Sequence, residues 1–296
     1  MAMAKRLKGM GQAKYQRDGD PRTSGPGFGV SVHPDALLVP LDWRKPRLIF
    51  VNSMSDLFHK EVPDDFIAQV FAVMAVTPHH TYQLLTKRHG RMRSLLGREK
   101  FADDVWGLAM QLDGGIAWRR RHWPLPNLWA GVSAEDQRWL EIRLRALRET
   151  PAAVRWISAE PLLGPLTFWP EDHAGHERDD CGEFGGWTWT CLDCSGPEAE
   201  EPRVPWRTYD RSEGIGIDWL VAGGESGPGA RPCDLAWLRS LRDECAEANV
   251  PYFCKQLGAV LGKELGAGGK GQDMSAWPAD LRVRQFPRVA EMTGAA

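Results

Sequence analysis

Polar and charged residues recur directly after six apolar runs, at the points where buried strands would end. The carboxyl ends of parallel strands meet at one edge of a sheet, so these residues would share one site. The residues predicted to be catalytic are Lys87, Glu135, Glu160, Glu225 and Lys255. The residues predicted to bind a substrate or cofactor are Ser53, Asp56, Arg88, Ser133, Ser158, Gly223, Gly224, Ser226 and Gln256.

Three of these strand ends repeat one pattern, a Trp near the start and an acid at the end: Trp129 to Glu135, Trp156 to Glu160, and Trp219 to Glu225. Carboxylates that face one cavity could bind a cation, pair with the basic residues or hold ribose hydroxyls. At least one could have a raised pKa suited to acid–base chemistry. The alternative is that some of these acids only begin the following helices, as the position of Glu135 allows. The glycines before Glu225 would let backbone approach a ligand closely.

A second group of candidate ligands lies between residues 173 and 194. Two cysteines spaced as Cys191-x2-Cys194 can grip one metal ion, and Cys181 with His176 would complete a structural zinc site. His173 is the alternative fourth ligand, and an insertion without metal is the competing interpretation. The other cysteines, Cys233, Cys245 and Cys254, fall in apolar segments and are expected to be small buried side chains.

The elements that must position these residues alternate between strand-like and helical patterns. The strand-like runs are 47–53, 81–87, 128–133, 154–158, 217–224 and 251–256. Helical spacing follows several of them, beginning near Asp64, Glu135 and Asp234. Parallel strands need such crossover helices, and burial on both faces makes them continuously apolar. The predicted fold is therefore α/β, a partial parallel (β/α) barrel, with a doubly wound open sheet as the alternative.

Four regions follow from this pattern. Residues 1–46 form a basic N-terminal arm and lead-in, and residues 47–164 and 215–258 form the barrel. An irregular insertion occupies 165–214, and a C-terminal tail covers 259–296, with a glycine-rich stretch at 258–273 that is expected to be flexible.

Composition sets broader expectations. The 296 residues carry a net charge of −2, so no general attraction to nucleic acid is expected, although the basic arm could touch phosphate. The sequence shows neither an apolar run of membrane-spanning length nor a signal-type start, which predicts a cytoplasmic protein without a membrane partner. Phosphate-loop, dinucleotide, zinc-protease and hydrolase-elbow motifs are absent from the sequence. Protein partners are not indicated.

Several segments in one order resemble a phage and bacterial family of unknown function that is distantly similar to radical S-adenosylmethionine enzymes, including the spore photoproduct lyase group. They are VNSMSDLFH (51–59), LLTKR (84–88), LWAGVSAE (128–135), ISAEPLLGPL (157–166), LVAGGESG (220–227) and CKQLG (254–258). The resemblance implies a TIM-like partial barrel, an iron–sulfur cluster and S-adenosylmethionine. In the family, three cysteines upstream of a segment similar to MAMAKRLKGMG hold the cluster, and these cysteines are missing here.

Three functional hypotheses follow. The first is a radical S-adenosylmethionine-like protein, truncated or without its cluster, that acts on a nucleotide, a nucleic acid or a modified base. In the truncated case Met1 would be an internal methionine of a longer reading frame. The second is a cluster-independent barrel enzyme that uses Glu and Lys for acid–base chemistry. The third is a non-catalytic binding protein.

Overall fold

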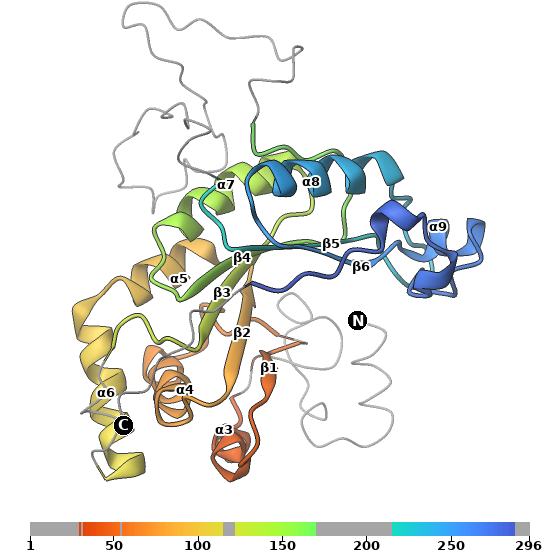
Figure 1. The fold of residues 1–296 in the computed structure, drawn as a ribbon. Coiled ribbons are helices and arrows are strands. Elements are labelled where there is room, and N and C mark those ends of the chain that lie inside the picture. The colour runs from red at the N-terminus through yellow and green to blue at the C-terminus, as the bar shows by residue number, and fades with distance from the viewer. Residues whose placement is uncertain (1–29, 31, 54, 115–121, 170–214, 288–296) are drawn as a thin grey trace, which may run out of the picture.

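Six parallel strands form one sheet that curls into a half-barrel (Figure 1). The computed structural model describes residues 30, 32–53, 55–114, 122–169 and 215–287. The strands are β1 (Leu48–Val51), β2 (Thr81–Thr86), β3 (Leu128–Ser133), β4 (Val154–Ala159), β5 (Trp219–Gly223) and β6 (Tyr252–Gln256). They lie side by side in chain order. A doubly wound sheet reverses its strand order part-way, so the partial barrel is confirmed and the open-sheet alternative is wrong.

Helices cover the convex face of this sheet (Figure 1). The α-helices are α3 (Pro34–Leu37), α4 (Asp64–Val76), α5 (His89–Leu96), α6 (Glu99–Asp113), α7 (Gln137–Arg148), α8 (Leu235–Glu247) and α9 (Ala259–Glu264). Short 3₁₀ turns are η2 (Val39–Asp42), η6 (Met274–Ala276) and η7 (Ala279–Leu281). Asp136 and Asp234 cap α7 and α8 by accepting hydrogen bonds from the backbone N–H groups of Trp139 and Ala236.

Alternation along the strands divides the apolar side chains between two cores. One core lies between the sheet and the helices and includes Tyr82, Leu84, Val132, Ile157 and Leu220. The residues between them in sequence point to the concave face, since successive side chains of a strand face opposite ways. There a second cluster, here called the concave cluster, contains Trp129, Val154, Trp156, Trp219 and Val221, with Leu85 and Phe253 packed against it.

The tryptophans of the repeated strand pattern thus meet on one face. Trp156 is the register partner of Trp219, and their ring centroids are 5.4 Å apart. The Trp156 ring also lies directly over Gly131 of β3, because a Cβ built on that glycine would come within 2.3 Å of the ring. Packing explains these tryptophans.

The chain beyond β6 packs against the half-barrel, including the glycine-rich stretch 258–273 that was expected to be flexible. Cys254 donates its backbone N–H to the Val283 carbonyl, and Phe253 forms an antiparallel bridge with Arg284, so this segment covers the free edge of β6. Trp277 is 2% exposed, and Asp280 pairs with arginines of α8. The glycine-rich stretch was misread because its glycines serve close packing. At Gly262, for example, an added Cβ would come within 2.6 Å of the carbonyl oxygen of Gly268.

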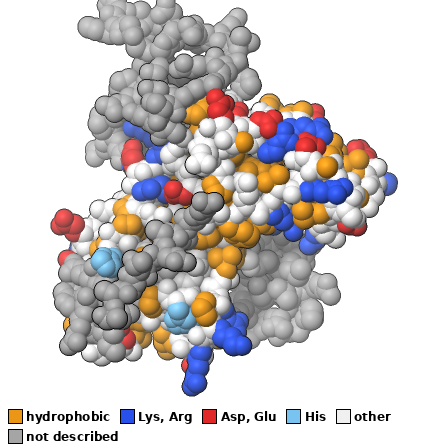
Figure 2. Space-filling view, viewed as in Figure 1, with side chains coloured by type: hydrophobic (Ala, Val, Ile, Leu, Met, Phe, Trp, Pro, Cys, Tyr) orange, Lys and Arg blue, Asp and Glu red, His pale blue; other side chains and the backbone are white. Residues whose placement is uncertain are grey.

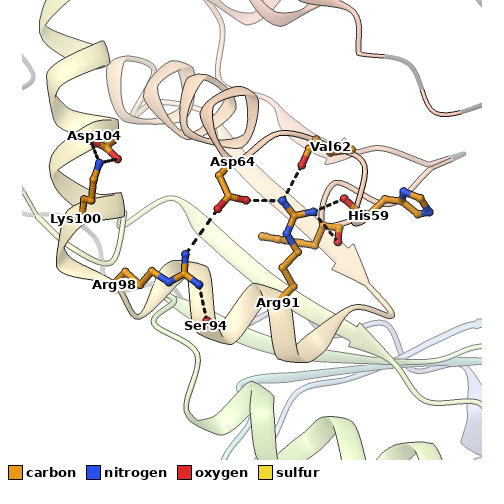
Figure 3. Close-up of polar contacts among 9 residues, drawn as sticks. His59, Val62, Asp64, Arg91, Ser94, Arg98, Lys100 and Asp104 are labelled. Atoms are coloured by element: carbon orange, nitrogen blue, oxygen red, sulfur yellow. Dashed lines mark hydrogen bonds and ion pairs between the residues drawn. The ribbon is translucent and has the colours of Figure 1, made fainter. Parts of the chain in front are cut away.

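An arginine on α5 ties the loop after β1 to the outer helices (Figure 3). Arg91 donates to the backbone carbonyls of His59 and Val62 and pairs with Asp64 in the first turn of α4. Arg98 lies 3.7 Å from the same carboxylate. Because Arg91 satisfies backbone oxygens as well as a charge, it fixes the course of the loop between β1 and α4.

Acidic and basic side chains are interspersed over the face drawn in Figure 2, above all in its upper part, where α7 and α8 lie. This mixture agrees with the small net charge of −2. Within the ranges that the structure describes, every helix is too short or too polar to cross a membrane.

Candidate functional site

The carboxyl ends of β2, β3, β4 and β6 carry two lysine–glutamate pairs. Lys87 contacts Glu135, and Lys255 Nζ lies 3.0 Å from Glu160 Oε2. In each pair the lysine is about half exposed, at 53% and 55%, whereas the glutamates are 12% and 14% exposed. Strands β3 and β4 are neighbours with Ser133 opposite Ser158 in register, so the two carboxylates follow adjacent strand ends. The structure therefore brings together four of the predicted catalytic residues.

Glu135 is held by two cations. Its second carboxylate oxygen accepts a hydrogen bond of 2.8 Å from Arg143 Nη1, which also donates to the Ser133 carbonyl. Burial alone would raise the pKa of Glu135, but the hydrogen bond from Lys87 and the charge of Arg143 outweigh it and hold the pKa below its usual value. The carboxylate is therefore ionised at neutral pH, and Glu135 does not have the raised pKa that was predicted for at least one of the three acids.

The structure also decides what Glu135 does for the following helix. Asp136, not Glu135, is the N-cap of α7. Glu135 instead pairs with a residue of the second turn of α7. Arg143 lies on the inward face of this helix with Leu140 and Leu144, and it donates to the Glu135 carboxylate. The Arg143 guanidinium also stacks 4.1 Å from the centre of the Trp139 ring. The helix-start interpretation of Glu135 is therefore wrong.

A histidine next to this group has a perturbed pKa. Burial lowers the pKa of His89, and the positive charge of Arg143 lowers it further, against a hydrogen bond to the Lys87 backbone that raises it. His89 is the first residue of α5, directly after Lys87 and Arg88. A neutral imidazole beside the strand ends can accept a proton at neutral pH.

Glu160 is positioned by short-range contacts from three strands. Ser158 donates to its carboxylate at 3.3 Å, and Lys255 donates to the same oxygen. A Cβ at Gly223 would lie 2.8 Å from Glu160 Oε1. Gly223 therefore leaves room for the Glu160 carboxylate. The group that closely approaches the glycine backbone is thus a side chain of the protein, where the sequence predicted a ligand.

The other members of the glycine loop have structural partners. A Cβ at Gly224 would come within 2.3 Å of the Leu257 carbonyl oxygen. Gln256 donates from its side-chain amide to the Gly224 carbonyl at 2.9 Å. Ser226 is exposed. These contacts join the end of β5 to the end of β6.

Glu225 turns toward its own loop. Its carboxylate accepts two hydrogen bonds from the Arg231 guanidinium and one from the Arg231 backbone N–H, which lower the pKa of Glu225 to about 2. The hydrogen bond to Glu225 raises the pKa of Arg231. Glu225 acts as a fixed anion that holds Arg231, which is 58% exposed.

The predicted binding residues after β1 and β2 hold the loops in place. Asp56 accepts hydrogen bonds from the Thr86 hydroxyl at 2.7 Å and from the backbone N–H of Lys87 at 3.0 Å. This ties the loop after β1 to the end of β2 and orients Lys87. Arg88 donates its backbone N–H to Thr86 and has an exposed side chain, and Ser53 is also exposed.

The predicted zinc ligands His176, Cys181, Cys191 and Cys194 lie outside the described residues, as does His173. Within the described ranges, groups of three or more His, Cys, Asp or Glu that could hold a metal ion are absent. Cys233, Cys245 and Cys254 are buried in the core between sheet and helices, as predicted, and burial raises the pKa of Cys233 and Cys254 to about 12. Thiols of this kind do not fit the thiolate ligands of an iron–sulfur cluster.

A comparison with protein-family models gives a match over residues 1–282 to a family described as "Protein of unknown function (DUF5131)". The chain belongs to this family. The match covers the half-barrel and ends at residue 282, directly before Val283 and Arg284, which cover the free edge of β6. Neither curated proteins nor solved structures give a significant match. The link to radical S-adenosylmethionine enzymes therefore rests on the sequence resemblance alone.

Sequence reasoning missed several residues of the site. Arg143 was overlooked because it falls within an apolar helical repeat, three residues after Leu140. A charged residue at such an inward position indicates a buried partner, and this signal could have identified it. Arg231 comes six residues after Glu225 in an irregular loop, and its pairing could not be predicted without the loop geometry. Gln83 interrupts the apolar run of β2, which was a readable signal of a polar group on the concave face.

Proposed function

We propose that this protein is an enzyme that binds a nucleotide, free or within a nucleic acid, at the carboxyl ends of the half-barrel strands. The observation that carries the proposal is the pair of half-exposed lysines, Lys87 and Lys255, each held at a strand end by a carboxylate. Lysine ammonium groups bind phosphate, and exposed Arg88 and Arg231 are the nearby guanidinium donors. The carboxylate oxygens of Glu135 and Glu160 can accept hydrogen bonds from sugar hydroxyls or amino groups.

The aromatic lining of the concave face supports the same substrate class, because Phe50, which is 43% exposed, packs beside the buried concave cluster. Its rings continue the face on which the lysines stand, since Trp156 and Ser158 are alternate residues of β4 and Ser158 contacts Glu160. Aromatic side chains next to cations are a common arrangement for nucleotides, in which rings stack on the base and cations bind the phosphate. Each pair offers one cation and one carboxylate. The site therefore favours a ligand that carries both anionic groups and hydrogen-bond donors.

The type of reaction has two candidates. A radical S-adenosylmethionine reaction rests on the resemblance alone, and no step is assigned to a cluster because the described cysteines do not fit one. In that case the role of the strand-end side chains would be to bind and orient the substrate. Acid–base chemistry without a cluster is favoured by one observation, the lowered pKa of His89 beside the Lys87–Glu135 pair.

The proposal predicts that replacing the two lysines weakens nucleotide binding. Lys87→Met and Lys255→Met each remove an ammonium group but keep an unbranched side chain. Each should raise the Kd for uridine monophosphate by roughly tenfold, the effect of losing one charge-assisted hydrogen bond, and the double variant should bind still more weakly. Isothermal titration calorimetry with the full chain measures these constants.

The matched control is Lys100→Met on α6. Lys100 also pairs with a carboxylate, that of Asp104 at 2.8 Å, but it lies on an outer helix (Figure 3). Its replacement should leave the Kd unchanged. Equal effects of the three single variants, or none in the double variant, would contradict the proposal.

A further inference from the structure

A buried amide on the concave face lacks a partner. Gln83 is 7% exposed, and its Nε2 has no hydrogen-bond partner within the part of the chain that the structure describes. The neighbours of Gln83 along β2, Tyr82 and Leu84, belong to the core beneath the helices. By strand alternation Gln83 therefore points to the concave face, the side of Leu85 and the concave cluster.

The neighbouring strand presents a second donor of the same kind. Trp129 is the register partner of Gln83, is 5% exposed, and among the described residues its Nε1 also lacks an acceptor. The other two tryptophans of the concave cluster differ. Trp156 Nε1 donates to the Trp129 carbonyl, and Trp219 Nε1 donates to the Gln285 carbonyl. Among the described tryptophans of the concave cluster, the unpaired indole N–H is thus that of Trp129, at the level of Gln83, and elsewhere Trp106 Nε1 and Arg143 Nε are also unpaired.

Leaving a buried donor without an acceptor is costly, and folded proteins pair most such groups. Two adjacent donors on one level imply an acceptor that lies between or above them. A carbonyl oxygen can accept two hydrogen bonds, so a single oxo group can satisfy both Gln83 Nε2 and Trp129 Nε1.

The surroundings suit a flat ring. On β1, the strand on the opposite side of β2 from β3, Phe50 is the register partner of Gln83 and is 43% exposed. The centroid of its ring lies 6.4 Å from that of Trp156. Leu48 on the same edge strand is 50% exposed, which leaves this side of the half-barrel open to a ligand. Lys87 comes four residues after Gln83, directly beyond the end of β2, a rise of about 13 Å at about 3.3 Å per residue. A nucleotide, with its sugar between ring and phosphate, has the size to span this distance.

We propose that Gln83 and Trp129 form a hydrogen-bond donor subsite for the oxo group of a planar heterocycle, with the half-exposed Phe50 ring against the heterocycle. The ligand class is an oxo-substituted nucleobase, such as the carbonyl edge of uracil, thymine or guanine. This inference rests on the proposed function, since it assigns the base end of a nucleotide whose phosphate end is bound by the lysines.

The test compares two probes, uridine monophosphate and ribose phosphate, by calorimetric titration of the full chain. Gln83→Met removes the amide and keeps the length of the side chain, and Trp129→Phe removes the indole N–H and keeps an aromatic ring. Each should raise the Kd for uridine monophosphate about fivefold to tenfold, the effect of one hydrogen bond, and leave the Kd for ribose phosphate unchanged. Lys255→Met should weaken both probes.

A stability measurement separates this role from a structural one. Gln83→Met removes a buried donor without a partner, so its melting temperature should equal or exceed that of the parent protein. An unchanged Kd for uridine monophosphate in both variants, or equal weakening of both probes, would overturn the subsite. Binding of ribose phosphate but not of uridine monophosphate by the parent protein would overturn the subsite alone. Binding of neither probe would overturn the proposed function as well.

Discussion

Replacing Gly131 by alanine should destabilise the protein by about 2 to 3 kcal/mol, the usual cost of forcing an extra group into a packed core. The added Cβ would lie 2.3 to 2.6 Å from three atoms of the Trp156 ring. That ring cannot retreat freely, because the Trp219 ring packs against it at 5.4 Å. Urea unfolding of Gly131→Ala followed by Trp fluorescence measures the free energy of unfolding.

The matched control for this substitution is Gly107→Ala. Gly107 lies in the middle of α6 with open space around the added Cβ. Alanine there should stabilise the helix by roughly 0.5 to 1 kcal/mol. A Gly131→Ala protein as stable as the parent would show that the concave cluster can repack, and would contradict the tight fit of Trp156 on β3.

Replacing Glu135 by glutamine should also cost stability, by about 3 kcal/mol, because Arg143 would remain buried without a charged partner. The Arg143 side chain is 4% exposed, so water cannot solvate the guanidinium in place of the carboxylate. The control is Glu149→Gln, since Glu149 is 50% exposed and pairs with Arg93 on the surface. Its loss should cost below about 1 kcal/mol.

The same pair gives the protein a defined response to acid. The pKa of Glu135 is lower in the folded protein than its usual 4.5, so its pairing stabilises the fold above the unfolded pKa. This stability is lost as the pH falls through the lower folded pKa. Glu135→Gln should therefore lose less stability than the parent between about pH 7 and about pH 3. Parallel curves of unfolding free energy against pH would show that the carboxylate is not held by Lys87 and Arg143.

The fold was largely predictable because parallel strands are buried on both faces. The run 128–133 has no charged residue, is apolar up to its last residue, Ser133, and matches β3 residue for residue. The helices after β1 and β5 were also predictable, since acids precede their apolar repeats. The segment after β6 was not, because glycines that permit close packing cannot be told in sequence from glycines that permit motion.

The candidate site was predictable in its location but less so in its roles. A parallel sheet puts Lys87, Glu135, Glu160 and Lys255 at one edge whatever the side-chain details, and the structure pairs them. The partner of Glu225 depends on how residues 225–231 turn, which local sequence does not fix. The zinc prediction stays a prediction, because its ligands fall outside the described residues.

The central claim is that a nucleotide binds on the concave side of the half-barrel, with its base against the aromatic rings. Photocrosslinking with iodouridine monophosphate, followed by mass spectrometry of the digested chain, tests this most directly. Adducts are expected on the concave side of β1, above all on the half-exposed Phe50, and excess uridine monophosphate should suppress them. Adducts confined to the outer helices α4 to α8, or adducts that excess uridine monophosphate does not reduce, would contradict it.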